Sequence, residues 1–353
     1  MPRFPYRLAL ILTGPENEDL GQHPIEPDWV PVRESVQFEL LRRDGISVTP
    51  IGEEDYSLTP IFSTESGGPW LEGVNAIADS DGQQFSLDFP NAAFVRPASR
   101  LLSARMVAEK KVETGDLITY RAVAYPIGDV PTPGQPSPFT EVAILPPIHE
   151  IAGLDATFPG AVRVETDAGD DAAEPFPILV SHDLIEEIKA ASEAADTVET
   201  GGLLLGRLHR YEDSDTHRLA VEITAQIHAQ YTEASNTSLR FTDETWSAAN
   251  HALRLRKSAV DSLAAEIVIG WWHSHPARTW CPEACPLENR LTCPKQAPFF
   301  SSDDLTLHRE VFPKAHQLGL LVNVADAGTT VSAYAANRGV VRQVPYRVTP
   351  ANS

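Results

Sequence analysis

Chemistry-bearing side chains are concentrated in one stretch of this 353-residue chain, residues 270–304, which reads GWWHSHPARTWCPEACPLENRLTCPKQAPFFSSDD. Its reactive groups are two histidines, all three cysteines of the chain and a terminal Ser-Ser-Asp-Asp: His273, His275, Cys281, Cys285, Cys293, Ser301, Ser302, Asp303 and Asp304. Imidazole, thiolate and carboxylate groups are the protein ligands of zinc, whereas serine and aspartate also cap helices. The stretch therefore predicts a metal site and leaves open which of these groups belong to it.

The two histidines stand one residue apart at the end of the apolar run AEIVIGWW. In an extended chain residues i and i+2 point to the same side, so His273 and His275 face one point. A His-x-His pair alone is more often two polar residues at a strand end. Asp304 alters that balance, because Ser301 and Asp304 have the spacing of a helix capping box, which would fix the aspartate side chain. Two histidines and one carboxylate would leave a fourth zinc position for water, as in catalytic zinc sites.

A candidate general base lies far upstream. The tripeptide Val-Glu-Thr occurs three times, with its acid at Glu113, Glu165 and Glu199. Only Glu199 follows a predicted helix and leads through Gly201-Gly202 into an apolar strand, and glycines allow close backbone approach. We expect Glu199 to be carried to the centre of a fold and the other two acids to be solvated.

Three ordered segments, ETGGLLLG, HSHP and FFSSDDL, resemble the MPN+/JAMM metalloproteases, whose pattern is a Glu, then His-x-His-Pro, then Ser-x-x-Asp. The resemblance covers residues 178–348, and within it the local sequence is most similar to that of AMSH-type deubiquitinases. It implies an MPN domain with a mixed sheet flanked by helices. Similar bacterial proteins are encoded beside ubiquitin-like conjugation enzymes.

Carried over to this chain, the resemblance implies that His273, His275 and Asp304 hold a catalytic Zn²⁺. Glu199 would take a proton from the zinc-bound water and pass it to the leaving amine, and Ser301 would help to hold the oxyanion. The implied activity is that of a zinc isopeptidase or peptidase. Its substrate would be a ubiquitin or ubiquitin-like protein, cleaved from its conjugate or C-terminal extension, with E1/E2-like conjugation enzymes as further partners.

The sequence departs from the family pattern between His275 and Asp304, where residues 276–303 form a much longer insertion that contains the cysteines. Three interpretations remain open. Cys281, Cys285 and Cys293 bind a second, structural zinc with His308 as the fourth ligand (His316 is the second choice); or two of them form a disulfide; or they are small hydrophobic residues. We favour the structural zinc, because a long proline-rich loop with little apolar content needs a metal or another cross-link to become ordered. Trp271, Trp272 and Trp280 are all expected to be packing residues, and Trp280 is the one of the three that could instead line a substrate groove.

The amino-acid composition limits which classes of partner and which cellular location are expected. The chain has 28 Lys+Arg and 49 Asp+Glu, a net charge of −21. Such an acidic surface repels phosphate backbones, so nucleic acid is not expected as a partner. The apolar run near the start, Leu8–Leu12, is too short for a signal segment, and no run approaches the length of a membrane span. Clustered cysteines favour a reducing compartment, so the expected location is cytoplasmic.

The periodicity of apolar residues and the local composition along the chain predict an α/β protein in three parts. Residues 1–125 read as a separate β-rich domain of unknown role, with strands at YRLALIL, VQFELL, FSLDF and LITYRAVAY and an Asp44-Gly45 hairpin turn. Residues 126–177 read as a proline-rich and acidic linker with one candidate strand, TEVAILPPI. Residues 178–348 alternate between helical and strand patterns, beginning with a helix capped by Ser181.

Two further functional hypotheses stand beside the isopeptidase. A non-catalytic MPN scaffold is disfavoured by the complete set of polar residues. A nucleoside deaminase-like zinc hydrolase would need His-x-Glu and Pro-Cys-x-x-Cys, whereas this chain has His-Ser-His and Cys-x-x-x-Cys.

Overall fold

The computed structural model describes residues 4–43, 56–63, 70–80, 83–127, 146–166, 174–213, 216–229, 232–234, 239–259, 266–282 and 284–351. The described residues divide into two compact units. One holds the described residues of 4–41, 56–127 and 338–340, and the other holds those of 42–43, 146–337 and 341–351. Asp44-Gly45, most of the proline-rich segment and most of the acidic linker lie outside the described residues.

The first unit contains two three-stranded antiparallel sheets and two helices. Strands β1 (Tyr6–Thr13), β2 (Asp19–Ile25) and β6 (Thr119–Pro126) form one sheet, in the order β2-β1-β6. Strands β3 (Tyr56–Phe62), β4 (Leu71–Ser80) and β5 (Gln83–Pro90) form the other. Helices α1 (Val30–Arg42) and α2 (Ala92–Ala108) complete it. Apolar residues from both sheets and both helices share one core, among them Leu10, Val36, Val74, Phe94 and Met106.

The prediction that residues 36–40 form a strand is wrong, and the first unit contains helices beside its strands. Val36, Phe38 and Leu40 are all buried, as a strand pattern requires, but they lie on α1. Val32, Val36 and Leu40 recur every four residues and are also buried, so the helical period was present as well. The start of α1 carries the local helix signals: the Asp28 carboxylate accepts a hydrogen bond from the Val30 N–H, and Pro31 lies in the first turn.

The second unit is built on a ten-stranded mixed sheet with the order β17-β16-β15-β14-β10-β11-β9-β18-β8, to which β7 adds by pairing with β10. Its strands are β7 (Ile148–Glu150), β8 (Val162–Val164), β9 (Ile178–Ser181), β10 (Gly201–Asp213), β11 (Thr216–His228), β14 (Ile267–His275), β15 (Leu318–Ala325), β16 (Gly328–Asn337), β17 (Val340–Val344) and β18 (Tyr346–Thr349). A short hairpin, β12 (Thr232–Ala234) and β13 (Leu239–Phe241), is separate. The mixed α/β class expected from the sequence is therefore present. The unit also takes in β7 and β8, which lie in the range assigned to the linker.

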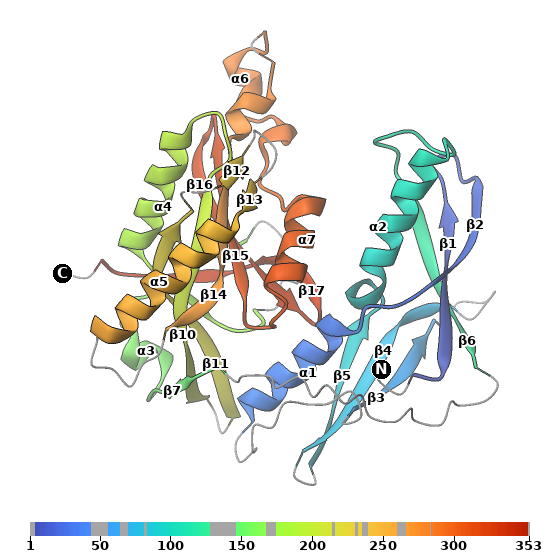
Figure 1. Ribbon diagram of the computed structural model, residues 1–353, viewed down its shortest axis with the longest axis horizontal. Helices are drawn as coiled ribbons and strands as arrows, with labels where there is room; N and C mark the ends of the chain where they lie inside the picture. The colour runs from blue at the N-terminus through green and yellow to red at the C-terminus, as the bar shows by residue number, and fades with distance from the viewer. Residues whose placement is uncertain are drawn as a thin grey trace. The chain divides into compact units, whose positions relative to one another are not determined.

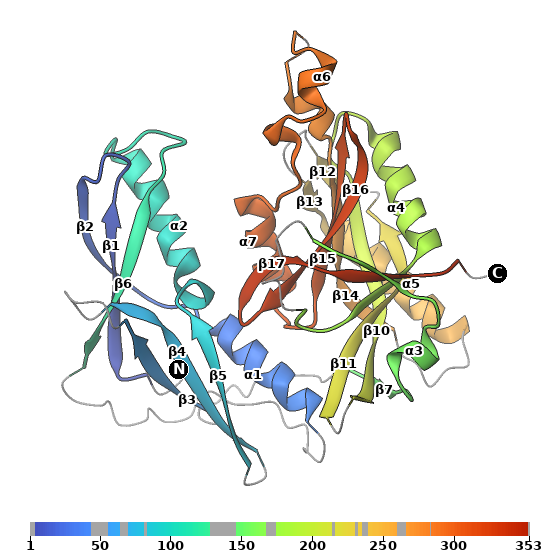
Figure 2. The same ribbon diagram turned by 180° about the vertical axis from the view of Figure 1, so that it is seen from behind.

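Helices α4 (His182–Ala195), α5 (Asp243–Ala259) and α7 (Ser302–Val311) run alongside this sheet (Figures 1 and 2). The unit also contains the short helices α3 (Leu154–Thr157) and α6 (Leu287–Arg290) and the 3₁₀ turns η1 (Ala277–Trp280) and η2 (Pro294–Gln296). As predicted, Ser181 caps α4, its hydroxyl accepting a hydrogen bond from the Leu184 N–H. The loop that carries α6 protrudes beyond the ends of the strands (Figures 1 and 2).

The centre of the sheet positions the candidate site. Strand β14 pairs antiparallel with β10 and parallel with β15. Leu203 of β10 and Trp271 of β14 are cross-strand partners, and they pack with Ala249 of α5 and with Phe312, just beyond α7. Both Trp271 and Trp272 are fully buried, as expected. Because β14 is buried from Ile269 to His275, it is a rigid support for the histidines at its end.

Candidate metal centre

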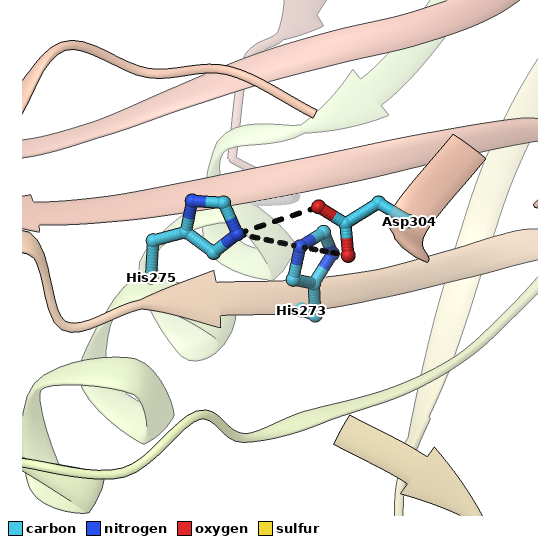
Figure 3. Close-up of side chains that lie close together, drawn as sticks. All are labelled: His273, His275 and Asp304. Atoms are coloured by element: carbon cyan, nitrogen blue, oxygen red, sulfur yellow. Dashed lines mark hydrogen bonds and ion pairs between the residues drawn. The ribbon is translucent and has the colours of Figure 1, made fainter. Parts of the chain in front are cut away.

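Two imidazole nitrogens and one carboxylate converge at the carboxyl end of β14. The Nε2 atoms of His273 and His275 lie 3.1 Å apart. Asp304 Oδ1 is 3.2 Å from His273 Nε2, and Asp304 Oδ2 is 3.5 Å from His275 Nε2. Figure 3 shows the two histidines of β14 and the aspartate of α7 pointing toward one another. Within the described ranges, this is the one group of three or more His, Cys, Asp or Glu donors close enough to share a metal ion.

The spacing of these donors fits zinc. Two ligand atoms about 2.05 Å from a tetrahedral ion are separated by about 3.3 Å, so the observed separations need little adjustment. The ligand set is also suitable, since neutral imidazole and carboxylate are ordinary zinc ligands and three protein ligands leave a fourth position. The predicted metal ligands His273, His275 and Asp304 are thus brought together.

Aromatic packing fixes the orientation of the two imidazoles. His273 stacks on Trp271, with ring centroids 4.5 Å apart and planes at 11°. His275 contacts both Trp280 and Phe299, with ring centroids 5.1 Å and 5.4 Å away. In the described part of the chain neither histidine Nδ1 has a hydrogen-bond partner. The rings are therefore held by packing rather than by the carboxylate that often supports a zinc-binding histidine.

Asp304 is held by the capping box that the sequence predicts. The Ser301 N–H donates to Asp304 Oδ2 at 2.7 Å, and the Asp304 N–H donates to Ser301 Oγ at 3.1 Å. Burial raises the pKa of Asp304, but the hydrogen bonds to His273 and His275 outweigh it and hold that pKa well below its usual range. Asp304 is therefore an anion poised beside two imidazoles. The Ser301 hydroxyl accepts the cap bond with its oxygen, so its own proton remains available for a second contact.

Glu199 lies beside this group, in the turn between α4 and β10. It is 3% exposed, and its Oε1 is 3.9 Å from His275 Nε2. The other two Val-Glu-Thr acids, Glu113 and Glu165, are exposed, as predicted. Burial, and then the nearby charge of Asp304, raise the pKa of Glu199 to about 8. A carboxyl group with such a pKa can both accept and return a proton near neutral pH.

Backbone pairing delivers Glu199 to the histidines. The Thr200 N–H donates to Ser274 Oγ at 3.0 Å, and the Ser274 N–H donates to the Thr200 carbonyl at 2.8 Å. Ser274 lies between the two histidines, so the chain that carries Glu199 is tied to their strand. Gly202 makes this approach possible, since a Cβ there would lie 2.3 Å from the Ile227 carbonyl oxygen and 2.6 Å from Trp272 Nε1.

The insertion between His275 and Asp304 is held by a polar network. Asp326 accepts two hydrogen bonds from Arg290 at 2.8 Å and one from Gln296 Nε2 at 2.7 Å. The buried Gln296 also accepts from the Asp326 N–H at 2.8 Å, and its carbonyl accepts from Asn323 Nδ2 at 2.7 Å. Arg290 and Gln296 belong to the insertion, whereas Asn323 and Asp326 lie on or next to β15. The loop therefore has a staple that does not depend on a metal.

The predicted second zinc site is only partly assembled. Gln296 Nε2 donates to Cys281 Sγ at 3.3 Å and lowers the pKa of that thiol, but contact with Cys293, burial and the charge of Cys285 together raise the pKa above its ordinary value. The three thiols are thus neighbours, and all three are free. Among the described residues, however, no three ligand atoms of the predicted second site lie as close together as those of His273, His275 and Asp304.

His308, the expected fourth ligand, points elsewhere. Its Nδ1 accepts a hydrogen bond from Trp271 Nε1 at 3.1 Å, and its ring packs near Phe312. Burial lowers its pKa to about 4. The position four residues after Asp304 lies one helical turn along α7, on the side that faces β14, which explains its burial. His316, the second choice, is also buried, with its pKa lowered to about 4, first by burial and then by Lys314.

A cavity of about 390 Å³ opens beside the candidate metal centre, lined by Glu199, His275, Trp280, Lys295, Phe299 and Ser301. Trp280 thus takes the groove position, which the sequence offered only as an alternative to packing. Phe299 and Lys295 were missed, although both lie in the insertion, and a lysine among prolines in so acidic a chain was a usable signal. No helix among the described residues is long and apolar enough to cross a membrane.

Comparisons with known proteins add little to this geometry. No family model matches the chain, and no curated protein matches it. Among solved structures, the chain is similar to the solution structure of protein DSY2949 from Desulfitobacterium hafniense, at 17% identity and a TM-score of 0.31. That likeness covers 50% of this chain and 94% of the other.

Proposed function

We propose that this chain is a zinc-dependent isopeptidase or peptidase that releases a ubiquitin-like protein from its conjugate or from a C-terminal extension. In this proposal residues 178–348 form an MPN+/JAMM domain, and the protein works in the cytoplasm beside E1/E2-like conjugation enzymes. The observation that carries the proposal is the convergence of His273, His275 and Asp304 with a buried acid, Glu199, at their edge.

The proposed reaction is hydrolysis of an amide bond. His273, His275 and Asp304 would hold the zinc, which supplies a Lewis acid and makes a water molecule acidic enough to ionise near neutral pH. Glu199 takes the proton from that water as the oxygen adds to the carbonyl carbon. The same proton passes to the amine nitrogen as the C–N bond breaks, so the products are a free amine and a carboxylic acid, which then releases its remaining proton to solvent.

The other groups act on the same step. The Ser301 hydroxyl donates a hydrogen bond to the oxygen that becomes negative in the tetrahedral intermediate. Its oxygen is already engaged by the Asp304 N–H, which fixes the side chain in the cavity wall. Trp280 and Phe299 cover one side of His275 and keep bulk water from the ligand group.

The test compares three variants of this protein, each of which replaces the glutamate of one of its three Val-Glu-Thr segments. Purified Glu199→Gln, Glu113→Gln and Glu165→Gln are assayed for zinc content and for cleavage of a panel of ubiquitin-like fusions and isopeptide conjugates. We expect Glu199→Gln to retain zinc and to lose about 10²–10⁴-fold in kcat/KM, whereas the two exposed controls keep full activity.

Two outcomes would contradict the proposal. Undiminished cleavage by Glu199→Gln would exclude the mechanism. A zinc-loaded wild-type protein that cleaves no member of the panel would instead favour a non-catalytic MPN scaffold, or another zinc hydrolase if a different amide or amidine substrate is turned over.

A further inference from the structure

The cavity beside Glu199 is walled largely by the inserted loop. Three of its six lining residues, Trp280, Lys295 and Phe299, come from the segment between His275 and Ser301. The insertion is therefore part of the cavity wall, and its side chains differ in kind from the carboxyl of Glu199 and the imidazole of His275. Substrate selection is expected to depend on what this wall offers.

Two aromatic rings form the apolar part of the wall. The ring centroids of Trp280 and Phe299 are 5.8 Å apart, and each ring also contacts His275. Phe299 is 47% exposed, which is a large apolar surface to leave beside a cavity. Such a pair suits an extended peptide segment, whose backbone and small side chains can lie against the rings.

Lys295 is the basic group of the wall. Its side chain is exposed, and no acid among the described residues pairs with its ammonium. Its electrostatic neighbour is the Cys293 thiol, whose pKa is lowered first by a hydrogen bond from the Lys295 backbone and also by the charge of Lys295. The chain has a net charge of −21, so a lysine left without an acid here is unusual. An ammonium beside an apolar wall attracts a carboxylate more strongly than one in open solvent, because the wall excludes water.

The backbone at Lys295 is also fixed. Lys295 is the middle residue of the 3₁₀ turn η2. The next residue, Gln296, is buried and is bonded to Asp326, Asn323 and Cys281. The network that staples the loop thus holds the base of the lysine side chain at the cavity while its tip remains free to meet a ligand.

We propose that Lys295 is a specificity-determining residue, which selects substrates carrying an Asp or Glu side chain on the segment that enters this cavity next to the scissile bond. Trp280 and Phe299 hold the backbone of that segment, and the Lys295 ammonium pairs with its carboxylate. The inference rests on the proposed peptidase function and names the class of substrate for the same site: an acidic peptide segment.

The experiment uses the full-length, zinc-loaded protein and fluorescent peptides that differ only in having Asp, Asn or Lys at each position flanking the scissile bond. Cleavage is measured with the wild type, and binding is measured with Glu199→Gln, which does not consume the peptide. We expect the Asp peptide to be preferred over the Asn peptide by about fivefold at one flanking position, through KM and Kd rather than kcat.

Variants at Lys295 separate charge recognition from loop structure. Lys295→Met removes the preference for Asp, and Lys295→Glu shifts it to the Lys peptide. Lys189→Met, a control on α4 whose lysine pairs with Glu186, leaves the preference intact. Trp280→Ala weakens binding of the Asp and Asn peptides to the same extent.

The failure of this inference differs from the failure of the proposed function. Equal binding and cleavage of the Asp and Asn peptides at every position, or a preference that survives in Lys295→Met, would overturn the role of Lys295 while leaving peptidase activity in place. A wild type that cleaves no substrate yet binds Asp peptides in a Lys295-dependent way would overturn the peptidase function and retain the acid-binding cavity.

Discussion

Ser301 has two separable roles, one structural and one chemical. Its hydroxyl oxygen caps α7 by accepting the Asp304 N–H, and its side chain lines the cavity beside Glu199. Loss of an N-cap costs about 1 kcal/mol of stability, whereas loss of an oxyanion donor costs about 2.7–4 kcal/mol of barrier. The loss of catalysis should therefore exceed the loss of stability when this hydroxyl is removed.

We predict that Ser301→Ala lowers kcat by about 10²–10³-fold while the free energy of unfolding falls by only about 1 kcal/mol. The matched control is Ser181→Ala, which removes the same kind of cap from α4. Steady-state kinetics and urea denaturation are measured on both. If Ser181→Ala loses as much activity as Ser301→Ala, the effect is one of stability and Ser301 has no chemical role.

A second residue-scale prediction concerns Glu199 in metal-free protein. Burial and Asp304 raise its folded pKa to about 8, from an ordinary value of 4.5. A raised pKa means that its contribution to stability is complete below the unfolded pKa and is lost as pH rises through the folded pKa. The Tm of the wild type in chelator should thus fall relative to that of Glu199→Gln between pH 5 and about 8.

Zinc provides the control for this prediction. A bound cation favours the ionised carboxylate, so the pH-dependent difference in Tm between the wild type and Glu199→Gln should shrink when zinc is added. Two parallel Tm curves in chelator would show that Glu199 ionises as readily in the folded state as in the unfolded chain, and that its burial does not govern its proton.

At the scale of elements, the inserted loop depends on Gln296. This side chain is buried and is bonded to both Cys281 and Asp326. Gln296→Ala would leave the Asp326 N–H without its side-chain acceptor, and we expect it to cost about 1–3 kcal/mol of stability. Limited proteolysis should then cut within residues 276–300 faster than in the wild type.

Gln317→Ala is the matched control for the loop. Gln317 also bridges backbone groups, accepting from the Lys314 N–H and donating to the Val268 carbonyl, but it lies outside the insertion. Its loss should not speed cleavage in residues 276–300. Equal cleavage rates for the wild type and Gln296→Ala would mean that the network around Gln296 does not order the loop.

The elements differed in how far the sequence could predict them. Helix α4, strands β10, β14 and β15 and the capping box of α7 were predictable, because each has one period, one cap or one long apolar run. Helix α1 was misread because its buried residues satisfy periods of both two and four, and only the full surroundings choose between them. The joining of β7 to β10 is a long-range pairing with no local signature.

The candidate metal centre followed the same rule. His273, His275, Asp304, Ser301 and Glu199 could be predicted, since their motifs lie at the ends of recognisable elements. The hydrogen-bond partner of His308 could not be predicted, because the direction of a side chain on a short helix depends on which neighbour it packs against, here Trp271. The role of Asp326 could not be predicted, because it arises from contacts with Arg290 and Gln296, which are distant in sequence.

Across the second unit, the candidate metal centre is positioned by packing, a helix cap and hydrogen bonds. Its histidines lie on a buried central strand, its aspartate is fixed by a helix cap, and the loop between them is tied to β15 by hydrogen bonds. Zinc should therefore stabilise the protein by binding the folded state, by about 2.7 kcal/mol at a free zinc concentration 100 times Kd, rather than create the fold.

The metal content of variants should reflect this arrangement. We expect one zinc per chain in the wild type, none after His273→Ala/His275→Ala, and one still bound after Cys281→Ser/Cys285→Ser/Cys293→Ser. Chelator should lower the Tm without loss of far-ultraviolet circular dichroism, because the core of the second unit persists without the ion. If the wild type instead binds two zinc ions and the cysteine variant binds one, the cysteines do hold a structural zinc. The cysteines would then have to recruit a fourth ligand other than His308, whose ring is committed to Trp271.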